Sequence, residues 1–284
     1  MKTLRIATLN IWNKSGPWLE RLPAIRAELG ELLPDVLGLQ EVLRMETGAA
    51  SFENPLDADQ AAQIADGFGY RVAFGRAADF GGGLSFGNAV LSRHPIKEQR
   101  NFALPGVESG ETRALCYALV ATPYGDLPVF VTHLNWKLHH GSVRLRQVLA
   151  VVDHIFELCP VDEARLPPVL MGDFNAHPEA DEIRYLRGEA TFEGTSVFFA
   201  DAWSYSGTGP GYTFDRKNRF AALAHEPPRR IDYIFVRGPD RLFRGEPLST
   251  RLAFANSRPG SDGEIWPSDH FGVVTEIAAE ARSK

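Results

Sequence analysis

Runs of apolar and β-branched residues recur along the whole chain, and turn-forming residues separate them. Such runs are typical of β-strands, and runs that are apolar at nearly every position indicate strands covered on both faces. We therefore expect a chain dominated by strands. The predicted strands lie at residues 5–11, 35–42, 71–75, 88–92, 114–121, 127–134, 168–171, 231–236 and 271–277.

Helical periodicity, with apolar residues three or four positions apart, occurs in fewer places. It predicts helices at residues 18–33, 58–67, 142–158 and 179–186. Ser142 is expected to be the N-cap of the third helix, because a serine side chain can accept a hydrogen bond from a free backbone N–H group of the first turn. The apolar face predicted for this helix consists of Val148, Val151, Val152, Ile155 and Phe156.

Two sheets packed together, with helices outside them, would cover the apolar strands on both faces. The sequence thus predicts a layered α/β sandwich. A chain of 284 residues can form one such domain. Since no linker or repeat divides it, we expect a single domain over residues 1–284. Glycine- and proline-rich segments at residues 79–87, 204–219 and 256–268 are expected to form long loops.

The composition is that of a globular protein, and the net charge of −6 argues against a surface that is basic throughout. Cys116 and Cys159 lack metal-ligand spacing and are expected to be core thiols. We find no apolar run as long as a membrane span and no signal-peptide pattern at the start. We therefore expect a cytoplasmic protein without a membrane span or an obligate protein partner.

Polar residues recur where the apolar strands end or begin. One such residue alone is more often a turn or cap residue than a ligand. Carboxylates, amides and imidazoles gathered at strand ends, however, offer both oxygen ligands for a cation and groups for acid–base chemistry. The positions concerned are Asn10, Glu41, His133, Asn135, Asp173, Asn175, Asp232, Asp269 and His270.

The sequences and the order of these segments resemble the motifs of the endonuclease/exonuclease/phosphatase superfamily, which includes deoxyribonuclease I. The resemblance spans residues 10–270, nearly the whole chain. It implies a deoxyribonuclease I-like α/β (α+β) fold: a four-layer sandwich of two packed mixed β-sheets flanked by helices, with the site at one end of the sheets. The matching segments are Thr-Leu-Asn10, Leu-Gln-Glu41, Asn88-Ala-Val-Leu-Ser-Arg, Thr-His133-Leu-Asn135, Gly-Asp173-Phe-Asn175-Ala, Arg-Ile-Asp232-Tyr and Ser-Asp269-His270.

The resemblance implies a metal-dependent phosphoric ester hydrolase. Glu41 is expected to bind Mg²⁺, which takes oxygen ligands and for which Mn²⁺ can substitute, with Asp269 and Asn10 contributing directly or through water. Apurinic-site endonucleases carry an acidic residue two positions after the first asparagine, where this chain has Trp12. We therefore expect one essential metal, and Trp12 to be a core residue or a flat wall of the cleft.

Hydrolysis of a phosphate ester needs a positioned water and positive charge near the phosphoryl oxygens. By the resemblance, Asp173 is expected to orient and deprotonate the attacking water, and Asn175 to direct its amide at the phosphate. His270 and His133 are expected to contact the phosphoryl oxygens, and Asp232 to pair with His270 and keep it protonated. The residues expected near the substrate are Asn135, Asn88 and Asn218.

Fold and reaction class do not identify the substrate. The first hypothesis is a phosphodiesterase acting on nucleic acid. The alternatives are a phospholipid or small-molecule phosphoesterase, similar to sphingomyelinases or inositol phosphatases, and a non-catalytic binding module that kept the fold. Basic residues expected near the cleft would favour nucleic acid: Arg144, Arg146, Arg216, Lys217, Arg219, Arg229 and Arg230.

Overall fold

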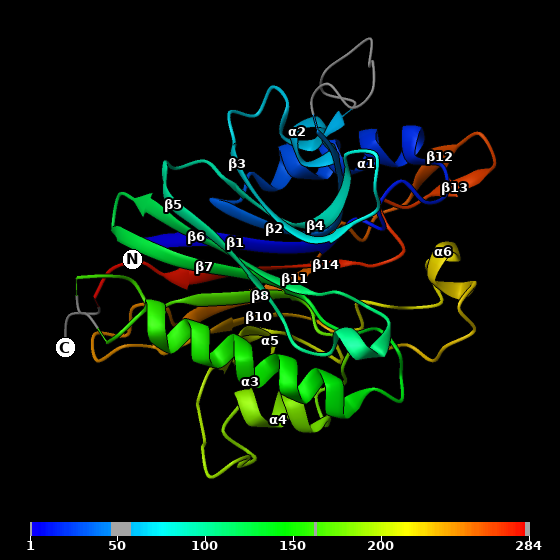
Figure 1. Cartoon of the computed structure of the whole chain (residues 1–284). Coiled ribbons are helices and arrows are strands. Elements are labelled where there is room, and N and C mark those ends of the chain that lie inside the picture. Colours follow the sequence, from blue (N-terminus) through cyan, green and yellow to red (C-terminus); the bar gives the residue numbers. More distant parts are fainter. Residues whose placement is uncertain (1, 47–57, 162–163, 282–284) are drawn as a thin grey trace.

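The computed structural model describes residues 2–46, 58–161 and 164–281. In this part of the chain, two six-stranded sheets pack face to face and a two-stranded hairpin stands apart from them. Helices cover the outer face of each sheet, which gives four layers (Figure 1). The predicted four-layer sandwich of mixed sheets is confirmed.

The first sheet has the strand order β11–β14–β1–β2–β4–β3. Strands β1 and β2 run parallel, whereas the other neighbouring pairs run antiparallel. The strands are β11 (Pro247–Ala253), β14 (Gly272–Ala278), β1 (Thr3–Asn10), β2 (Val36–Met45), β4 (Leu84–Ser92) and β3 (Arg71–Asp79).

The second sheet has the order β5–β6–β7–β8–β10–β9, with β7 and β8 parallel and the other pairs antiparallel. A separate hairpin is formed by β12 (Arg258–Gly260) and β13 (Gly263–Ile265). The strands of the second sheet are β5 (Ile96–Ala103), β6 (Ala114–Thr122), β7 (Gly125–His133), β8 (Val169–Asp173), β10 (Asp232–Val236) and β9 (Ala200–Asp201).

Helices α1 (Trp18–Leu32) and α2 (Gln60–Ala65) pack on the outer face of the first sheet. Helices α3 (Gly141–Leu158) and α4 (Asp181–Leu186) pack on the outer face of the second. Shorter turns of helix lie in the connections: a 3₁₀-helix at Val107–Ser109, α5 (Ala202–Ser206) and α6 (Arg219–Ala222).

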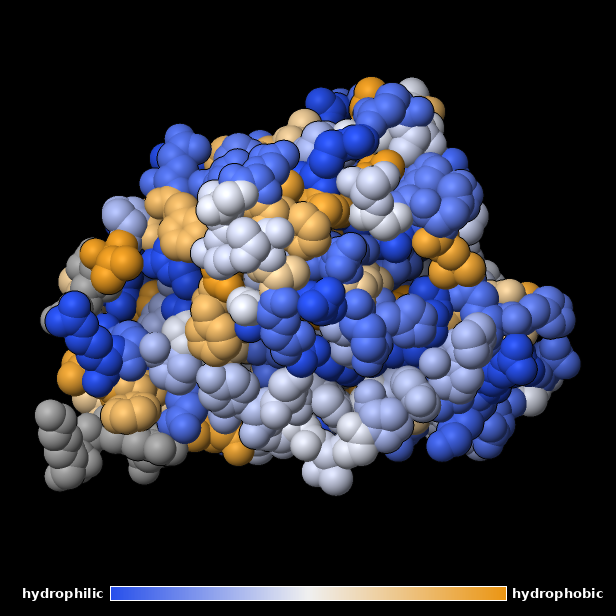
Figure 2. Space-filling model, turned by 90° about the horizontal axis from the view of Figure 1, so that it is seen from below, coloured by the Kyte–Doolittle hydropathy of each residue, from blue (hydrophilic) through white to orange (hydrophobic). Residues whose placement is uncertain are grey.

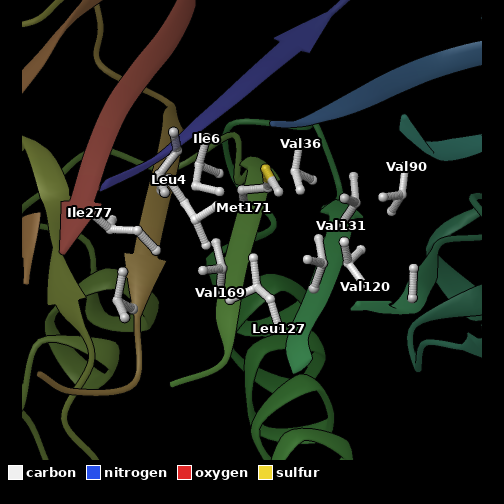
Figure 3. Close-up of a cluster of buried hydrophobic side chains, with 14 of the residues drawn as sticks. Leu4, Ile6, Val36, Val90, Val120, Leu127, Val131, Val169, Met171 and Ile277 are labelled. Atoms are coloured by element: carbon white, nitrogen blue, oxygen red, sulfur yellow. The ribbon is translucent and has the colours of Figure 1, made fainter. Parts of the chain in front are cut away.

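The central core lies between the two sheets. Ile6 and Val36 of the first sheet pack with Val131 and Met171 of the second, and all four side chains are buried (Figure 3). These residues alternate along their strands with others that face the helices, so each of these four central strands is apolar on both faces. This is why the strands appear in the sequence as nearly continuous apolar runs.

Each predicted strand and helix has a counterpart in the structure, and both predicted core thiols, Cys116 and Cys159, are buried and free. The pattern missed three strands at sheet edges: β9, which has two residues, and β5 and β11, which carry many polar side chains. An edge strand that faces solvent lacks the apolar run by which the other strands were recognised.

Three details of the prediction are wrong. The N-cap residue of helix α3 is His140, whose side chain makes no capping hydrogen bond, and Ser142 lies inside the first turn. Phe156 is 45% exposed and packs under the guanidinium of Arg237 instead of facing the core. The expected loop at residues 256–268 contains the β12–β13 hairpin, and the expected loop at residues 79–87 ends where β4 begins.

The strand directions bring the distant polar segments to one edge of the sandwich. The end of β1 lies between the start of antiparallel β14 and the middle of parallel β2, where Asn10 is opposite Gln40, and the ends of β7 and β8 lie beside the start of β10. In the second sheet Asp173 at the end of β8 is the register partner of Asp232 at the start of β10. The site is therefore assembled by the topology of both sheets.

The face below α3 and α4 is covered mostly by hydrophilic residues, with hydrophobic residues in small separate groups (Figure 2). Such a surface is typical of the solvent-facing side of helices that cover a sheet. None of the helices in the described ranges has both the length and the hydropathy needed to cross a bilayer.

Candidate functional site

A bulge in β2 places Glu41 at the site. The pairing of β2 with β4 shifts register between Leu39 and Val42, and Glu41 has a φ of 60°, in the left-handed region. A bulge of this kind bends its strand and redirects a side chain, at a cost in backbone strain that favours a functional position. Glu41 thereby reaches the residues at the end of β1.

Asn10 connects the carboxylates of the two sheets. Its Nδ2 donates to Oε1 of Glu41 at 3.2 Å and to Oδ2 of Asp173 at 3.0 Å. Its Oδ1 accepts from the backbone N–H of Trp12 at 2.9 Å, and Asn13 donates to the second oxygen of Glu41 at 2.9 Å. In this orientation the amide nitrogen of Asn10, and not its oxygen, faces Glu41.

Asp173 lies at the centre of the assembly and is almost completely buried. Gly172 before it has a φ of 139°, and a Cβ there would lie 1.9 Å from the carbonyl oxygen of Thr132, so only glycine allows this approach of β7 and β8. The backbone N–H of Asn175 donates to Oδ1 of Asp173 at 2.8 Å. The Asn175 side chain donates to the Leu134 carbonyl at 3.2 Å.

His270 is held between two carboxylates. Its Nδ1 bonds to Oδ2 of Asp232 at 2.9 Å, and its Nε2 lies 3.7 Å from Oδ2 of Asp173. The loop before it is fixed because the Ser268 hydroxyl donates to the carbonyl oxygen of Asn10 at 2.6 Å. The expected pairing of Asp232 with the last histidine is thus present in the geometry.

His133 faces Asp173 from the other side, with its Nε2 3.5 Å from Oδ2. Its Nδ1 accepts a hydrogen bond at 3.1 Å from Nη1 of Arg113, because a guanidinium group has donors only. Arg113 also donates to Glu111 at 2.8 Å. Since Nδ1 is the acceptor, the proton of a neutral His133 ring is on Nε2, which points at the site.

The two imidazoles therefore have opposite charge preferences. Burial alone would lower the pKa of His270, but the carboxylates of Asp232, Asp173 and Asp269 together raise it well above its ordinary value. Burial, and then the positive charges of Arg113 and His270, lower the pKa of His133 well below its ordinary value. Burial and the Asp232 carboxylate raise the pKa of Asp173. At neutral pH this gives one cationic and one neutral imidazole around a carboxylate that binds protons readily.

The oxygen-rich side of the site suits a divalent cation. Burial first, and the negative charge of Glu41 in the same direction, raise the pKa of Asp269 to about 6. Two neighbouring carboxylates that repel each other offer the oxygen ligands that a hard cation prefers. Single ligand atoms of Asp173, Asp232 and His270 also lie within 4.8 Å of one another. Because both ring nitrogens of His270 already face carboxylates, we interpret this second group as a proton-holding relay.

The three asparagines expected near the substrate use their side chains within the protein. Asn135 donates to Ser109 and accepts from Lys137 N and from His140, while Asn88 donates to the Ala114 carbonyl. Asn218 caps α6 and donates to the Ser268 carbonyl at 2.6 Å. Asn218 thus positions the loop that carries Asp269 and His270, and substrate contact by these three side chains stays a prediction.

Most of the basic residues expected to line the cleft are engaged elsewhere. Arg144 and Arg230 are buried in ion pairs with Glu182 and Asp201. The rest of this group includes arginines paired with acidic side chains or with backbone carbonyls: Arg146, Arg216, Arg219 and Arg229. These arginines therefore add little to the case for a nucleic-acid groove.

Comparison with known proteins identifies the group to which this arrangement belongs. A family model described as the Endonuclease/Exonuclease/phosphatase family matches residues 7–270. The chain belongs to the endonuclease/exonuclease/phosphatase family. A curated relative, the uncharacterized protein YbhP of Escherichia coli strain K12, is 30% identical over 178 residues, which are 61% of this chain and 67% of YbhP.

Solved structures of the endonuclease/exonuclease/phosphatase family have the same fold. A family member from Beutenbergia cavernae is 26% identical, with a TM-score of 0.69 over 98% of this chain and 72% of that one. D. rerio TDP2, complexed with a single strand DNA product, has a TM-score of 0.71 at 19% identity over 98% and 99% of the chains. The human Nocturnin catalytic domain, with a bound sulfate anion, has a TM-score of 0.68 at 18% identity over 97% and 93%.

Arg113 was missed by the sequence analysis of this family member. It directly precedes an apolar strand, β6, whose start lies at the same edge as the end of β7. The rule that singled out the other polar residues, a charged side chain where an apolar strand begins, would have found it.

Arg21 on α1 was also missed. It is fully buried, and its guanidinium lies next to the rings of Trp12 and Trp18. It donates to the backbone carbonyls of Ile11, Trp12, Asn13, Ser15 and Pro267. Burial lowers its pKa to about 10, while Asp269 and Glu41 act in the opposite direction. In this family member Arg21 ties the loop that follows Asn10 to the loop that carries Asp269. Trp12 is half-buried and also packs on Phe220.

Proposed function

We propose that this protein is a divalent-metal-dependent phosphodiester hydrolase that acts on nucleic acid. The observation that carries the proposal is the convergence of Glu41, Asp173, His133 and His270 from both sheets, with one imidazole cationic and the other neutral. A phosphoryl group needs these partners: oxygen ligands for a cation, a base and two donors. Family membership supports the same class of reaction.

Glu41 and Asp269 would hold the metal, with Asn10 contributing through its hydrogen bond to Glu41 or through water. A bound Mg²⁺ or Mn²⁺ would supply positive charge to the phosphoryl oxygens as negative charge builds on them. Arg21 donates to the backbone carbonyls of Ile11 and Pro267, which flank the proposed metal site, and makes no hydrogen bond to the carboxylates of Glu41 and Asp269. We propose one essential metal.

Asp173 is proposed to orient the attacking water and accept its proton, because burial beside Asp232 favours the protonated form of its carboxyl. The His270 cation would bind a phosphoryl oxygen, and the Nε2–H of His133 would donate to another. Asn175 would direct its amide at the same phosphate if the hydrogen bond to Leu134 is exchanged on binding.

The choice of nucleic acid as substrate is supported by the structural likeness to D. rerio TDP2, which is complexed with a single strand DNA product. The cytoplasmic location also stays a proposal. Phospholipid and small-molecule esters are the competing substrates, and a binding module without turnover is the competing non-enzymatic function.

The test is hydrolysis of bis(p-nitrophenyl) phosphate and of p-nitrophenyl phosphate, with Mg²⁺, with Mn²⁺ and with chelator. Faster turnover of the diester, dependent on metal and absent in Asp173→Ala, is the expected result. A second screen compares single-stranded DNA, duplex DNA, RNA, sphingomyelin and inositol phosphates with the same variant as blank. Absence of turnover on every substrate would favour the binding module.

A further inference from the structure

A cavity of about 350 Å³ opens beside His133, between the β3–β4 hairpin of the first sheet and the end of β7 in the second. Glu41 and Arg113 line it together with His133. Pockets for small ligands are commonly about 300–1,000 Å³. A phosphate that contacts His133 would therefore place one of its two ester substituents in this cavity.

Three aromatic rings line the same cavity: Phe80 after β3, Phe86 in β4 and Trp136 after β7. Phe80 is 61% exposed and Trp136 is 56% exposed, and the Phe80 and Phe86 ring centroids lie 5.8 Å apart. Large apolar side chains left exposed beside a polar site indicate a binding surface more than a core. We call this cavity, with its three rings, the aromatic pocket.

The remaining wall of the aromatic pocket is polar. Glu111, Thr112 and Arg113 line it, and Glu111 and Arg113 form an ion pair at 2.8 Å. A flexible acyl chain would cover these polar groups without giving them a hydrogen bond, which is costly. A nucleobase has flat faces that stack on rings and a polar edge that meets charged or hydroxyl groups.

We propose that the aromatic pocket binds one nucleobase of the substrate while the adjoining phosphate lies against His133. The inference rests on the proposed function and adds to it the group that is recognised next to the scissile phosphate. Because every base has faces that stack, recognition by the rings is tolerant of base identity. It applies equally to a base in a strand and to a base in a small nucleotide.

Binding is tested without turnover by titration calorimetry in the presence of Mg²⁺. The two ligands are thymidine 5′-monophosphate and deoxyribose 5-phosphate, which differ by the base alone. We expect the wild type to bind the nucleotide at least about tenfold more tightly, as base–aromatic stacking allows. Trp136→Ala and Phe80→Ala should each remove most of this difference, whereas Leu138→Ala, which replaces an equally exposed apolar residue outside the pocket, should leave it unchanged.

Turnover is tested with the dinucleotide thymidylyl-thymidine and with its two analogues that lack one base. The analogue without the base that occupies the pocket should lose about tenfold in kcat/KM, and Trp136→Ala should remove the difference between substrates. A single-stranded oligothymidylate that binds more tightly than the monophosphate assigns the pocket to a strand. Equal affinity for the oligothymidylate and for the monophosphate assigns the pocket to small nucleotides. Both results support a base site.

Equal affinity of the wild type for nucleotide and sugar phosphate would overturn the inference, as would an equal loss of affinity for both ligands in Trp136→Ala. The two proposals fail separately. A base-dependent affinity without hydrolysis of any dinucleotide refutes the hydrolase and leaves the base site standing. Normal hydrolysis that ignores removal of either base refutes the base site alone.

Discussion

Arg113 donates a hydrogen bond to Nδ1 of His133 over 3.1 Å, and it does so from a buried position. The guanidinium thus selects the ring tautomer and opposes protonation of the ring. His270 has the reverse arrangement, since its Nδ1 faces the Asp232 carboxylate. The site consequently contains one neutral and one cationic imidazole, and under the proposed function these are the two donors to a phosphate.

Replacement of Arg113 by methionine should lower kcat/KM on bis(p-nitrophenyl) phosphate by about 10- to 100-fold, the usual effect of losing a group that orients a site residue. The reason is that His133 can then move its proton to Nδ1 and lose the donor at Nε2. The imidazole ¹⁵N shifts of His133 report the tautomer directly. Arg113→Lys should recover part of the activity, and Arg100→Met, on an exposed arginine of β5, should have no effect. A ring that carries its proton on Nδ1 in the wild type would contradict this account.

Asp232→Asn should lower turnover on the order of 10²-fold or more, because an amide cannot hold His270 as a cation. The fold should persist, since asparagine has nearly the same shape and Thr213 still accepts from the backbone N–H of residue 232. Measurement of kcat together with the midpoint of thermal unfolding separates the two effects. Unaltered turnover in a folded variant would count against the pairing of Asp232 with His270.

The metal proposal predicts that Mg²⁺ or Mn²⁺ raises the midpoint of thermal unfolding, because a ligand that binds the native state stabilises it. Glu41→Gln should lose most of this shift, and turnover should stop with chelator and return with added metal. Asp79→Asn, at an exposed acidic residue, serves as the control. A shift of the same size in wild type and Glu41→Gln would place the metal elsewhere.

Glu28 on α1, outside the candidate site, should make the stability of the fold depend on pH. Burial raises the pKa of its carboxyl, although the carboxylate accepts from the backbone N–H of Asn256 at 3.1 Å, with Glu31 and Arg258 as its charged neighbours. A raised pKa in the folded state means that its contribution to stability is complete below the unfolded pKa and is lost as pH rises through the folded pKa.

Glu28→Gln keeps the hydrogen-bond acceptor and removes the buried charge. Its free energy of unfolding, measured by urea denaturation, should therefore exceed that of the wild type at pH 8 and match it at pH 4. Glu157→Gln, at a residue with 76% side-chain exposure, should follow the wild type at both values. A variant that is less stable than the wild type at pH 8 would refute the assignment.

Periodicity and apolar runs were sufficient to predict the buried strands and the sandwich, because those strands are covered on both faces and carry the signal along their whole length. Edge strand β5 alternates exposed polar residues with half-buried ones, so the same signal is weak there. The residues of the candidate site could be named because short sequence motifs and their order along the chain can be recognised even where the ends of strands and helices are misplaced.

Side-chain direction could not be predicted in the same way. The bulge at Glu41 depends on how β2 pairs with β4, a relationship between segments that are distant along the chain. The role of Arg113 depends on β6 running beside β7 in the opposite direction. Asn88 and Asn135 were placed near the substrate by sequence motif alone, whereas their hydrogen bonds are set by neighbouring strands and loops.

Arg21 gives all of its hydrogen bonds to backbone carbonyls, so peptide dipoles, and not Glu41 or Asp269, satisfy its donors. Its positive charge nevertheless lies close enough to both carboxylates to ease their mutual repulsion. The chain therefore supplies, from its own guanidinium and amide groups, the balance that lets Glu41 and Asp269 lie near each other in the folded protein. The proposed cation would then add its binding energy to a native state that already has its shape, and the gain in stability would grow with the concentration of free cation.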